Sequence, residues 1–224
     1  MPPPPPKTVT MIRHGRSLAN EYLSSLDWGA PGFQDASHLR DSPLSPFGVK
    51  QAEALSDRLR AAFPDPPSTA VLVSPLTRTL STMELALAGG AFPGAARVAT
   101  PELAERVYMS ADLGTPASEL RGRHPGVEFG GEEEWWWRPG EGYEEWRPSG
   151  GGQRYACEGE VEGDFLERMG RLVERIGERE EEHVVLVSSW GVLRELTGRD
   201  DIGNCEVIGN VPFEEIRERV MRKR

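Results

Sequence analysis

Three short apolar runs, rich in β-branched residues, constrain the fold of this chain more than any other feature. They lie at 8–12, 70–73 and 183–187, and each is followed by polar or glycine-containing sequence. Continuous apolar runs of this length are typical of parallel strands buried on both faces. Between them lie segments with helical spacing of apolar residues, and strands that alternate with helices form a mostly parallel sheet. We therefore predict an α/β fold, a three-layer sandwich with a mostly parallel central sheet and helices on both faces.

The same patterns place the individual elements. A further short strand is expected around Val98 and ends near Leu103. Helices are predicted from Ser17 to about Leu26, from Gly48 to Phe63, from the first turn at Pro75 through Leu87, from Val161 to Glu182, and through Leu196.

The length of 224 residues suits one large α/β domain better than two small ones. Residues 1–7 are rich in proline and are expected to form a disordered leader, while residues 8–224 form a single domain. From about 113 to 160 the sequence is dense in Gly, Glu and Pro, and its apolar residues are too sparse for a core of their own. We interpret this stretch as an excursion from the domain, anchored by the packing of Trp135, Trp136 and Trp137.

Charge and composition exclude several classes of partner. The formal net charge of -10 argues against a general nucleic-acid or anionic-membrane binder. No apolar run approaches the ~20 residues of a membrane helix, and the first residues lack the apolar segment of a secretory signal. Two cysteines, Cys157 and Cys205, form no disulfide framework. We therefore predict a cytoplasmic location, with an organelle as the open alternative.

The first apolar run ends in Arg13-His14-Gly15, which is followed by Arg16, Ser17 and the first predicted helix. This junction places an imidazole and two guanidinium groups at the carboxyl end of a strand, where open α/β sheets bind ligands. The free N–H groups of the helix favour an anion, and arginine suits phosphate. His14 is then an electrostatic partner, a general base, or a nucleophile that takes up a phosphoryl group. The alternative is a surface turn with a solvated histidine.

Several segments, in order along positions 8 to about 198, resemble motifs of the histidine phosphatase superfamily, the phosphoglycerate-mutase-like proteins. The first is the strand that ends in Arg13-His14-Gly15. The others are Asp41-Ser42-Pro43-Leu44-Ser45-Pro46-Phe47-Gly48 with Gln51-Ala52, Ser74-Pro75-Leu76-Thr77-Arg78-Thr79, Leu103-Ala104-Glu105, and Val185 to Gly191. The resemblance implies the phosphoglycerate-mutase-like fold and an active site for a phosphorylated small molecule.

By this resemblance, His14 is the nucleophile that becomes phosphorylated on a ring nitrogen. Arg13 and Arg78 hold the phosphoryl oxygens, and Glu105 protonates the leaving oxygen and later activates water, with Glu102 as the alternative. Phosphoryl transfer needs an in-line nucleophile, dense positive charge and a proton donor. Arginines can supply that charge, so we predict neither a metal nor another cofactor.

Three further residues beside His14 are candidate phosphate- or substrate-binding groups. Asn20 follows His14 by somewhat more than one helical turn, and Arg16 and Ser17 lie between the two. Arg16 equally suits a role as a solvent-facing side chain.

Position 189 departs from the pattern of the family, which places a second histidine there, across the phosphate from the nucleophile. Ser189 is predicted to bind phosphate and can donate one neutral hydrogen bond, but it carries no positive charge. The loss of one preorganised donor typically lowers a rate by about 10²–10³-fold. His183 cannot replace it, because it lies roughly 20 Å away at the other end of the strand, and His38 and His124 fall in irregular segments.

The sequence therefore predicts a cofactor-independent, histidine acid-type phosphatase that hydrolyses a small phosphomonoester through a phosphohistidine at His14, weakened at Ser189. The expected partners are a small phosphorylated metabolite or inorganic phosphate, with no nucleic acid and no membrane. One alternative is a catalytically impaired protein that binds a phosphorylated ligand. Others are an active enzyme in which a loop residue replaces the missing donor, an engineered substitution at Ser189, and a phosphoglycerate-mutase-type phosphotransferase, which requires a closed, water-poor site.

Overall fold

The computed structural model describes residues 6–25, 37–130, 134–137 and 160–224, in which helices and strands alternate along the chain. The strands are β1 (Thr8–Arg13), β2 (Thr69–Val73), β3 (Ala96–Ala99), β4 (His183–Ser188) and β5 (Val207–Pro212). The α-helices are α1 (Leu18–Leu23), α2 (Pro46–Ala62), α3 (Thr77–Leu87), α4 (Ala117–Arg123), α5 (Glu162–Gly177), α6 (Trp190–Thr197) and α7 (Phe213–Met221). Short 3₁₀ turns are η1 (Ser37–Leu39), η2 (Pro101–Leu103) and η3 (Ser110–Asp112). No helix in the described ranges is long and apolar enough to cross a membrane.

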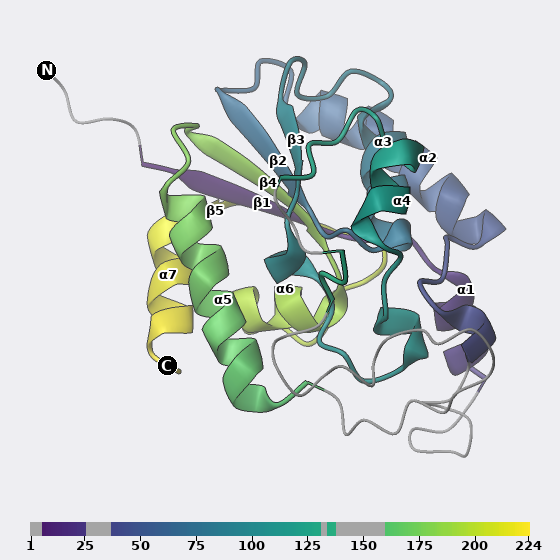
Figure 1. The fold of residues 1–224 in the computed structure, drawn as a ribbon. Coiled ribbons are helices and arrows are strands. Elements are labelled where there is room, and N and C mark those ends of the chain that lie inside the picture. Colours follow the sequence, from purple (N-terminus) through teal and green to yellow (C-terminus); the bar gives the residue numbers. More distant parts are fainter. Residues whose placement is uncertain (1–5, 26–36, 131–133, 138–159) are drawn as a thin grey trace, which may run out of the picture.

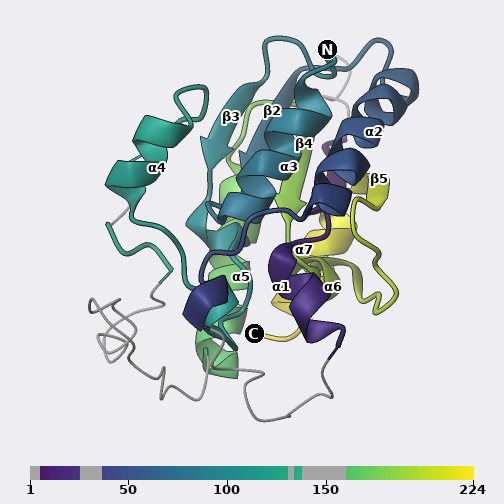
Figure 2. The ribbon, with the colours of Figure 1, turned by 90° about the vertical axis from the view of Figure 1, so that its right-hand side faces the viewer.

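The five described strands form one sheet in the order β3-β2-β4-β1-β5. β1, β2, β3 and β4 run parallel to one another, and β5 at the edge is antiparallel to β1. Figure 1 shows this sheet between α5 and α7 on the left and α2 and α3 on the right, and in Figure 2 the latter pair faces the viewer. The predicted α/β sandwich with a mostly parallel sheet is therefore confirmed.

Apolar side chains fill both faces of the sheet, which explains the continuous apolar runs in the sequence. Val185 and Val187 of β4 pack with residues of α2 and α3 in one core. Val184 and Leu186 of the same strand point to the other face, where they pack with residues of α5, α6 and α7. Neighbouring residues of a strand point to opposite faces, so a strand between two helical layers needs apolar residues at every position.

The register of the central strands decides where a site can form. β1 pairs with β4 so that Arg13 stands opposite Ser188, and β2 pairs with β4 so that Val73 stands opposite Val187. The carboxyl ends of three neighbouring strands therefore reach the same edge of the sheet. The segments that follow them begin side by side, as is usual for ligand sites of open α/β sheets.

Local capping sets the first two helix starts. α1 begins at Leu18, one residue after the predicted start, because Ser17 is its N-cap and forms a capping box with Asn20. α2 begins at Pro46, earlier than predicted, because the Ser45 hydroxyl caps it and proline suits the first turn.

Other elements differ from the sequence-based expectation or were not predicted. α3 begins at Thr77, so Pro75 precedes the helix instead of lying in its first turn, and α5 ends at Gly177, before the predicted Glu182. α4, β5 and α7 were not predicted. β5 contains Gly209 and Asn210 and is an exposed edge strand, so it lacks the apolar run that marks the buried strands.

The region from 113 to 130 packs on the main core. Leu113, Leu120 and Val127 belong to the core on the α2–α3 side, and the backbone of Glu128 pairs with β3. Trp136 and Trp137 lie in the same core, which confirms the predicted packing of the tryptophan cluster. The part of the predicted excursion at 138–159, and the predicted leader at 1–5, lie outside the described residues.

Candidate active site

A cavity of about 260 Å³ lies at the carboxyl edge of the sheet. Of the predicted site residues, it is lined by Arg13, His14, Ser17, Asn20, Arg78 and Glu105. These residues come from β1, the loop after it, α1, α3 and the segment after η2, so the fold brings distant parts of the chain to one place.

Backbone hydrogen bonds fix the position of His14. Its N–H donates to the carbonyl of Ser188 at the end of β4, over 2.9 Å. Its carbonyl accepts from the side-chain amide of Asn204, over 3.0 Å, and from the N–H of Cys205, over 3.3 Å. The N–H of the next residue, Gly15, donates to the Thr82 hydroxyl of α3, over 3.0 Å. The loop is therefore held by three segments that are far apart in the sequence.

The imidazole of His14 has a defined tautomer. Its Nδ1 lies 2.7 Å from the carbonyl oxygen of Gly15, and since a carbonyl can only accept, Nδ1 carries the proton. In the neutral ring, Nε2 then has a free lone pair. Burial, together with the positive charges of Arg78 and Arg13, holds the pKa of His14 well below its usual range. The ring is therefore neutral at neutral pH and can act as a nucleophile through Nε2.

Glycines allow the loop after His14 to lie directly against α2. A Cβ atom on Gly15 would lie 2.7 Å from the carbonyl oxygen of Gly48, and one on Gly48 would lie 2.0 Å from the carbonyl oxygen of Arg16. Both approaches are too close for any other residue. The backbone of Arg16 is fixed on both sides, by the Gln51 side chain and by the N–H of Ser45.

Of the four arginines that line the cavity, Arg13 and Arg78 are predicted site residues. Arg78 is only 4% exposed, and its Nη1 donates to the carbonyl of Ala111 over 2.7 Å. Arg13 donates through Nη1 to the carbonyl of Ile202 over 2.5 Å, while its buried Nε has no partner among the described residues. Burial lowers the pKa of Arg13, and nearby Glu105 opposes that shift. Unpaired N–H groups of this kind suit the oxygens of a bound phosphate.

Asp112 belongs to the same cavity and was not predicted. Its Oδ1 accepts from Nη2 of Arg78 over 3.1 Å, and its Oδ2 accepts from the backbone N–H groups of Tyr108 and Met109. Burial raises the pKa of Asp112 to about 6, although the Arg78 guanidinium acts in the opposite direction. The buried pair fixes the plane of the arginine. The only signal in the sequence was a carboxylate a few residues after Glu105.

Glu105 lies close to the N-terminus of α6. Its Oε1 accepts from the N–H of Arg106 over 2.8 Å, and its Oε2 accepts from the N–H of Gly191 over 3.0 Å. A Cβ atom on Gly191 would lie 2.2 Å from Oε1. Glu102, the alternative from the sequence, is absent from the lining of this cavity and forms an ion pair with Arg175 of α5, over 3.3 Å.

Ser189 is the buried N-cap residue of α6, and its hydroxyl lies 3.5 Å from Nη2 of Arg78. Of the four histidines in the chain, only His14 lines the cavity. His183 lies at the opposite end of β4 and contacts the Thr10 hydroxyl, and His124 pairs with Glu84 of α3. Neither replaces an imidazole at position 189.

The remaining predicted residues divide into two groups. Ser17 and Asn20 line the cavity and hold each other through the capping box of α1. Arg16 does not line the cavity; its Nη2 donates to the hydroxyl of Ser24 over 3.0 Å on the surface. The structure therefore brings Ser17 and Asn20 to the other site residues, but not the side chain of Arg16.

Within the described ranges, no group of three or more His, Cys, Asp or Glu side chains is placed to hold a metal ion. Among other groups, the cavity combines a neutral histidine with a free Nε2, the guanidinium groups of Arg13 and Arg78, and the carboxyl group of Glu105. Groups of these kinds are the ones that transfer of a phosphoryl group to and from a histidine requires. Fold and site thus define an α/β protein with a histidine in an arginine-lined cavity at the carboxyl edge of its sheet.

Comparison of the sequence with models of known protein families identifies one family. The model of the histidine phosphatase superfamily (branch 1) matches residues 9–199. The chain belongs to this superfamily. Comparison with curated protein sequences gives no match.

Two solved structures with TM-scores of 0.50 or more share the fold, and a third similar structure is a mutase. An ecdysone phosphate phosphatase from Bombix mori, in complex with tungstate, has a TM-score of 0.53 at 16% identity and covers 90% of this chain and 87% of its own. The alpha-ribazole phosphatase from Shigella flexneri has a TM-score of 0.50 at 23% identity, with 94% and 84% covered. A phosphoglycerate mutase from Thermus thermophilus has a TM-score of 0.48 at 22% identity, with 90% and 91% covered.

Proposed function

We propose that this protein hydrolyses small phosphomonoesters through a phosphohistidine formed on Nε2 of His14. The observation that carries the proposal is the hydrogen bond from Nδ1 of His14 to the Gly15 carbonyl, which leaves Nε2 as the free nitrogen in a cavity that Arg13 and Arg78 also line. Membership of the histidine phosphatase superfamily supports the same class of reaction.

In the proposed reaction, Arg13 and Arg78 bind the phosphoryl oxygens and Nε2 of His14 attacks phosphorus. The bond from phosphorus to the alcohol oxygen breaks, and the carboxyl group of Glu105 gives its proton to that oxygen. Glu105, now a carboxylate, takes a proton from water, which attacks the phosphohistidine. The nitrogen–phosphorus bond breaks, its electron pair returns to Nε2, and inorganic phosphate leaves.

Ser189 sets the expected rate. A histidine there would offer a charged donor, whereas the serine hydroxyl offers a neutral one at 3.5 Å from Arg78. We propose that turnover is about 10²–10³-fold slower than with the full set of donors. The second candidate function is a protein that binds a phosphorylated ligand without turnover. Ser189 also favours that candidate, because it leaves the arginines in place and removes a donor.

Hydrolysis of p-nitrophenyl phosphate separates the two functions. The unmodified protein is expected to turn over slowly, and His14→Ala is expected to abolish turnover, whereas His38→Ala, at an exposed histidine outside the cavity, is a matched control. Intact-mass measurement after mixing with substrate should find an acid-labile phosphate adduct that His14→Ala lacks. Turnover that persists in His14→Ala overturns the phosphohistidine. Binding of phosphate without turnover, in the unmodified protein and in Ser189→His alike, favours the binding protein.

A further inference from the structure

The residues that line the cavity fall into two groups by exposure. His14, Arg78 and Asp112 are almost fully buried. Tyr108 and Trp190, by contrast, are each 37% exposed, and Phe165, Leu166 and Leu23 lie in the same lining. Few large apolar residues in the described part of the chain are this exposed. Two of them, Tyr108 and Trp190, line the cavity that holds the proposed nucleophile.

Both aromatic rings are held in fixed positions. The indole Nε1 of Trp190 donates to the carbonyl of Asp200 over 3.0 Å, and the guanidinium of Arg194 lies over the ring, 5.5 Å from its centroid. The guanidinium of Arg106 lies over the ring of Tyr108, at 5.1 Å. Each arginine covers one side of a ring and orients it, so the rings are preorganised to pack against a ligand.

Two charged lining residues, Arg194 and Glu195, already have ion-pair partners that do not line the cavity. Arg194 forms an ion pair with Asp200, and Glu195 forms one with Lys223 over 2.9 Å. The charges of these two lining residues are therefore neutralised from outside the cavity.

Two further lining charges, those of Arg106 and Glu162, are opposite in sign. Arg106 donates through Nε to the carbonyl of Glu160 over 3.1 Å and lies between the rings of Tyr108 and Phe165. Glu162 lines the cavity with it. A second anionic group on a substrate, such as a carboxylate or another phosphate, would meet one cation and one carboxylate of its own sign, and these two residues together give no net positive charge.

We propose that the alcohol part of the substrate is an uncharged aromatic or bulky apolar group that packs on Trp190 and Tyr108. This inference rests on the phosphatase function proposed above, because the phosphate must occupy the inner arginines. It separates this protein from enzymes whose phosphomonoester also carries a carboxylate. A volume of about 260 Å³ is near the lower end of the range for small-molecule sites, which suits a phosphate joined to a compact ring system.

Two phosphonates that are not hydrolysed test the preference without requiring turnover. 2-Phenylethylphosphonate and 3-phosphonopropionate share the phosphonate and a two-carbon linker, and they end in a phenyl ring and a carboxylate. Calorimetry is expected to find the phenyl compound bound about 10-fold more tightly, the value of a well-packed aromatic contact. Equal binding, or tighter binding of the carboxylate compound, overturns the inference. Binding of neither compound instead refutes the phosphate pocket and the proposed function with it.

Substitutions in the cavity test which residues give the preference for the phenyl compound. Trp190→Ala is expected to remove most of the preference for the phenyl compound and to leave the affinity for methylphosphonate unchanged. Met221→Ala, which truncates an exposed apolar residue of α7 outside the cavity, is the matched control. If Trp190→Ala also weakens methylphosphonate binding, Tyr108→Leu is the second test. Loss of the phenyl preference in Tyr108→Leu, at unchanged methylphosphonate affinity, supports the inference. A phenyl preference that persists in both variants overturns it.

Discussion

Gly191 is the residue whose substitution should separate stability from activity most clearly. It lies in the first turn of α6, where its N–H donates to Glu105 and the space that a side chain would need is filled by the Glu105 carboxyl group. We expect Gly191→Ala to fold normally and to lose most of the proposed phosphatase activity.

The magnitude follows from the distances. A Cβ atom at position 191 would lie 2.2 Å from Oε1 of Glu105, and ordinary contacts begin at 3.4 Å, so the carboxyl oxygen must move by about 1.2 Å. A misplacement of about 1 Å in a catalytic group typically lowers the rate by ~10²-fold. Alanine is favoured over glycine in a helix by up to about 1 kcal/mol, and one hydrogen bond to a charged group is worth about 1.5–3 kcal/mol. The free energy of unfolding should therefore fall by at most about 2 kcal/mol.

The assay compares kcat/KM for an alkyl phosphate with the free energy of unfolding in urea. Gly163→Ala is a matched control, because Gly163 lies in the first turn of α5 and nothing lies within 4 Å of the position that a Cβ atom would take there. In the background of Glu105→Gln, the Gly191→Ala substitution should add little to the loss, since both act on one group. An unchanged kcat/KM in folded Gly191→Ala would refute the role of Glu105 as the proton donor.

Three further outcomes are expected. Ser189→His should raise kcat by about 10-fold or more by adding a donor, and steady-state kinetics that show no gain contradict the assigned weakness. Asp112 has a folded-state pKa of about 6, above the ordinary 3.8, so the folded state holds its proton more tightly. The free energy of unfolding should therefore fall as pH rises from about 4 to 6, and Asp112→Asn should flatten that slope in urea titrations. Arg168→Met leaves Glu160 buried without its partner and should lower the free energy of unfolding in urea by about 3–5 kcal/mol. The double variant Arg168→Met with Glu160→Gln should recover much of that loss. Equal losses in the single and the double variant argue against the ion pair as the cause.

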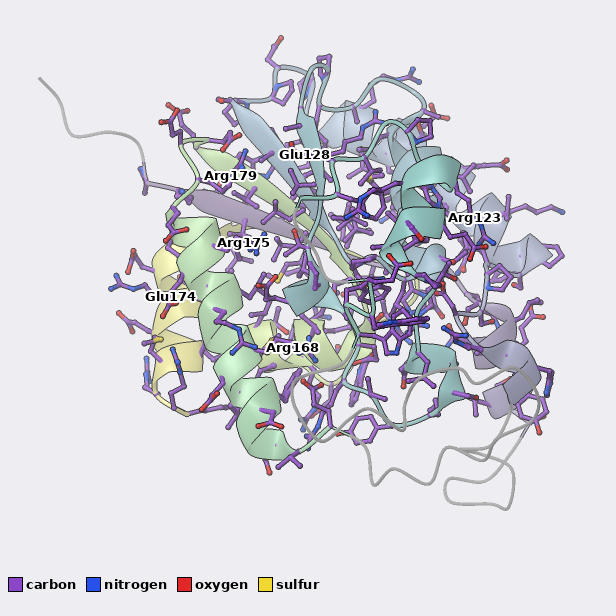
Figure 3. The ribbon with its side chains drawn as sticks, viewed as in Figure 1. Arg123, Glu128, Arg168, Glu174, Arg175 and Arg179 are labelled. Atoms are coloured by element: carbon purple, nitrogen blue, oxygen red, sulfur yellow. The ribbon has the colours of Figure 1, made fainter. Side chains whose placement is uncertain are left out.

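The ion pair of Arg168 and Glu160 also supports the segment that carries Glu105. Arg168 comes from α5 (Figure 3), and its Nη1 donates to the carbonyls of Glu102 and Ala104, each over 2.8 Å. The loss of stability in Arg168→Met should therefore be accompanied by a loss of kcat that exceeds any change in KM.

The central sheet and the residues at its carboxyl edge could be predicted because each leaves a local signal. His14 and Arg78 both follow a buried apolar run within a few residues, and parallel strands align these positions in space. Apolar periodicity also predicts the long helices, although capping by residues such as Ser45 moves their starts.

What could not be predicted depends on contacts between distant residues. Asp112 lies in a 3₁₀ turn without periodicity, and its partner Arg78 lies 34 residues earlier. The direction of the Arg16 side chain depends on its contact with Ser24 at the end of α1. β5 is exposed at the edge of the sheet, so its sequence carries no apolar run.

The hydrogen bonds that hold β1 and His14 have a consequence for the order in which the site can form. The first strand of the chain pairs with the last, and the carbonyl of His14 is bound by Asn204 and Cys205. During synthesis, the segment with His14 leaves the ribosome well before these partners, since Asn204 follows it by 190 residues. A nascent chain that ends at 199, the last residue matched by the family model, would carry His14 on a strand with one open edge. The loop with His14 is thus made long before the residues that hold it in place.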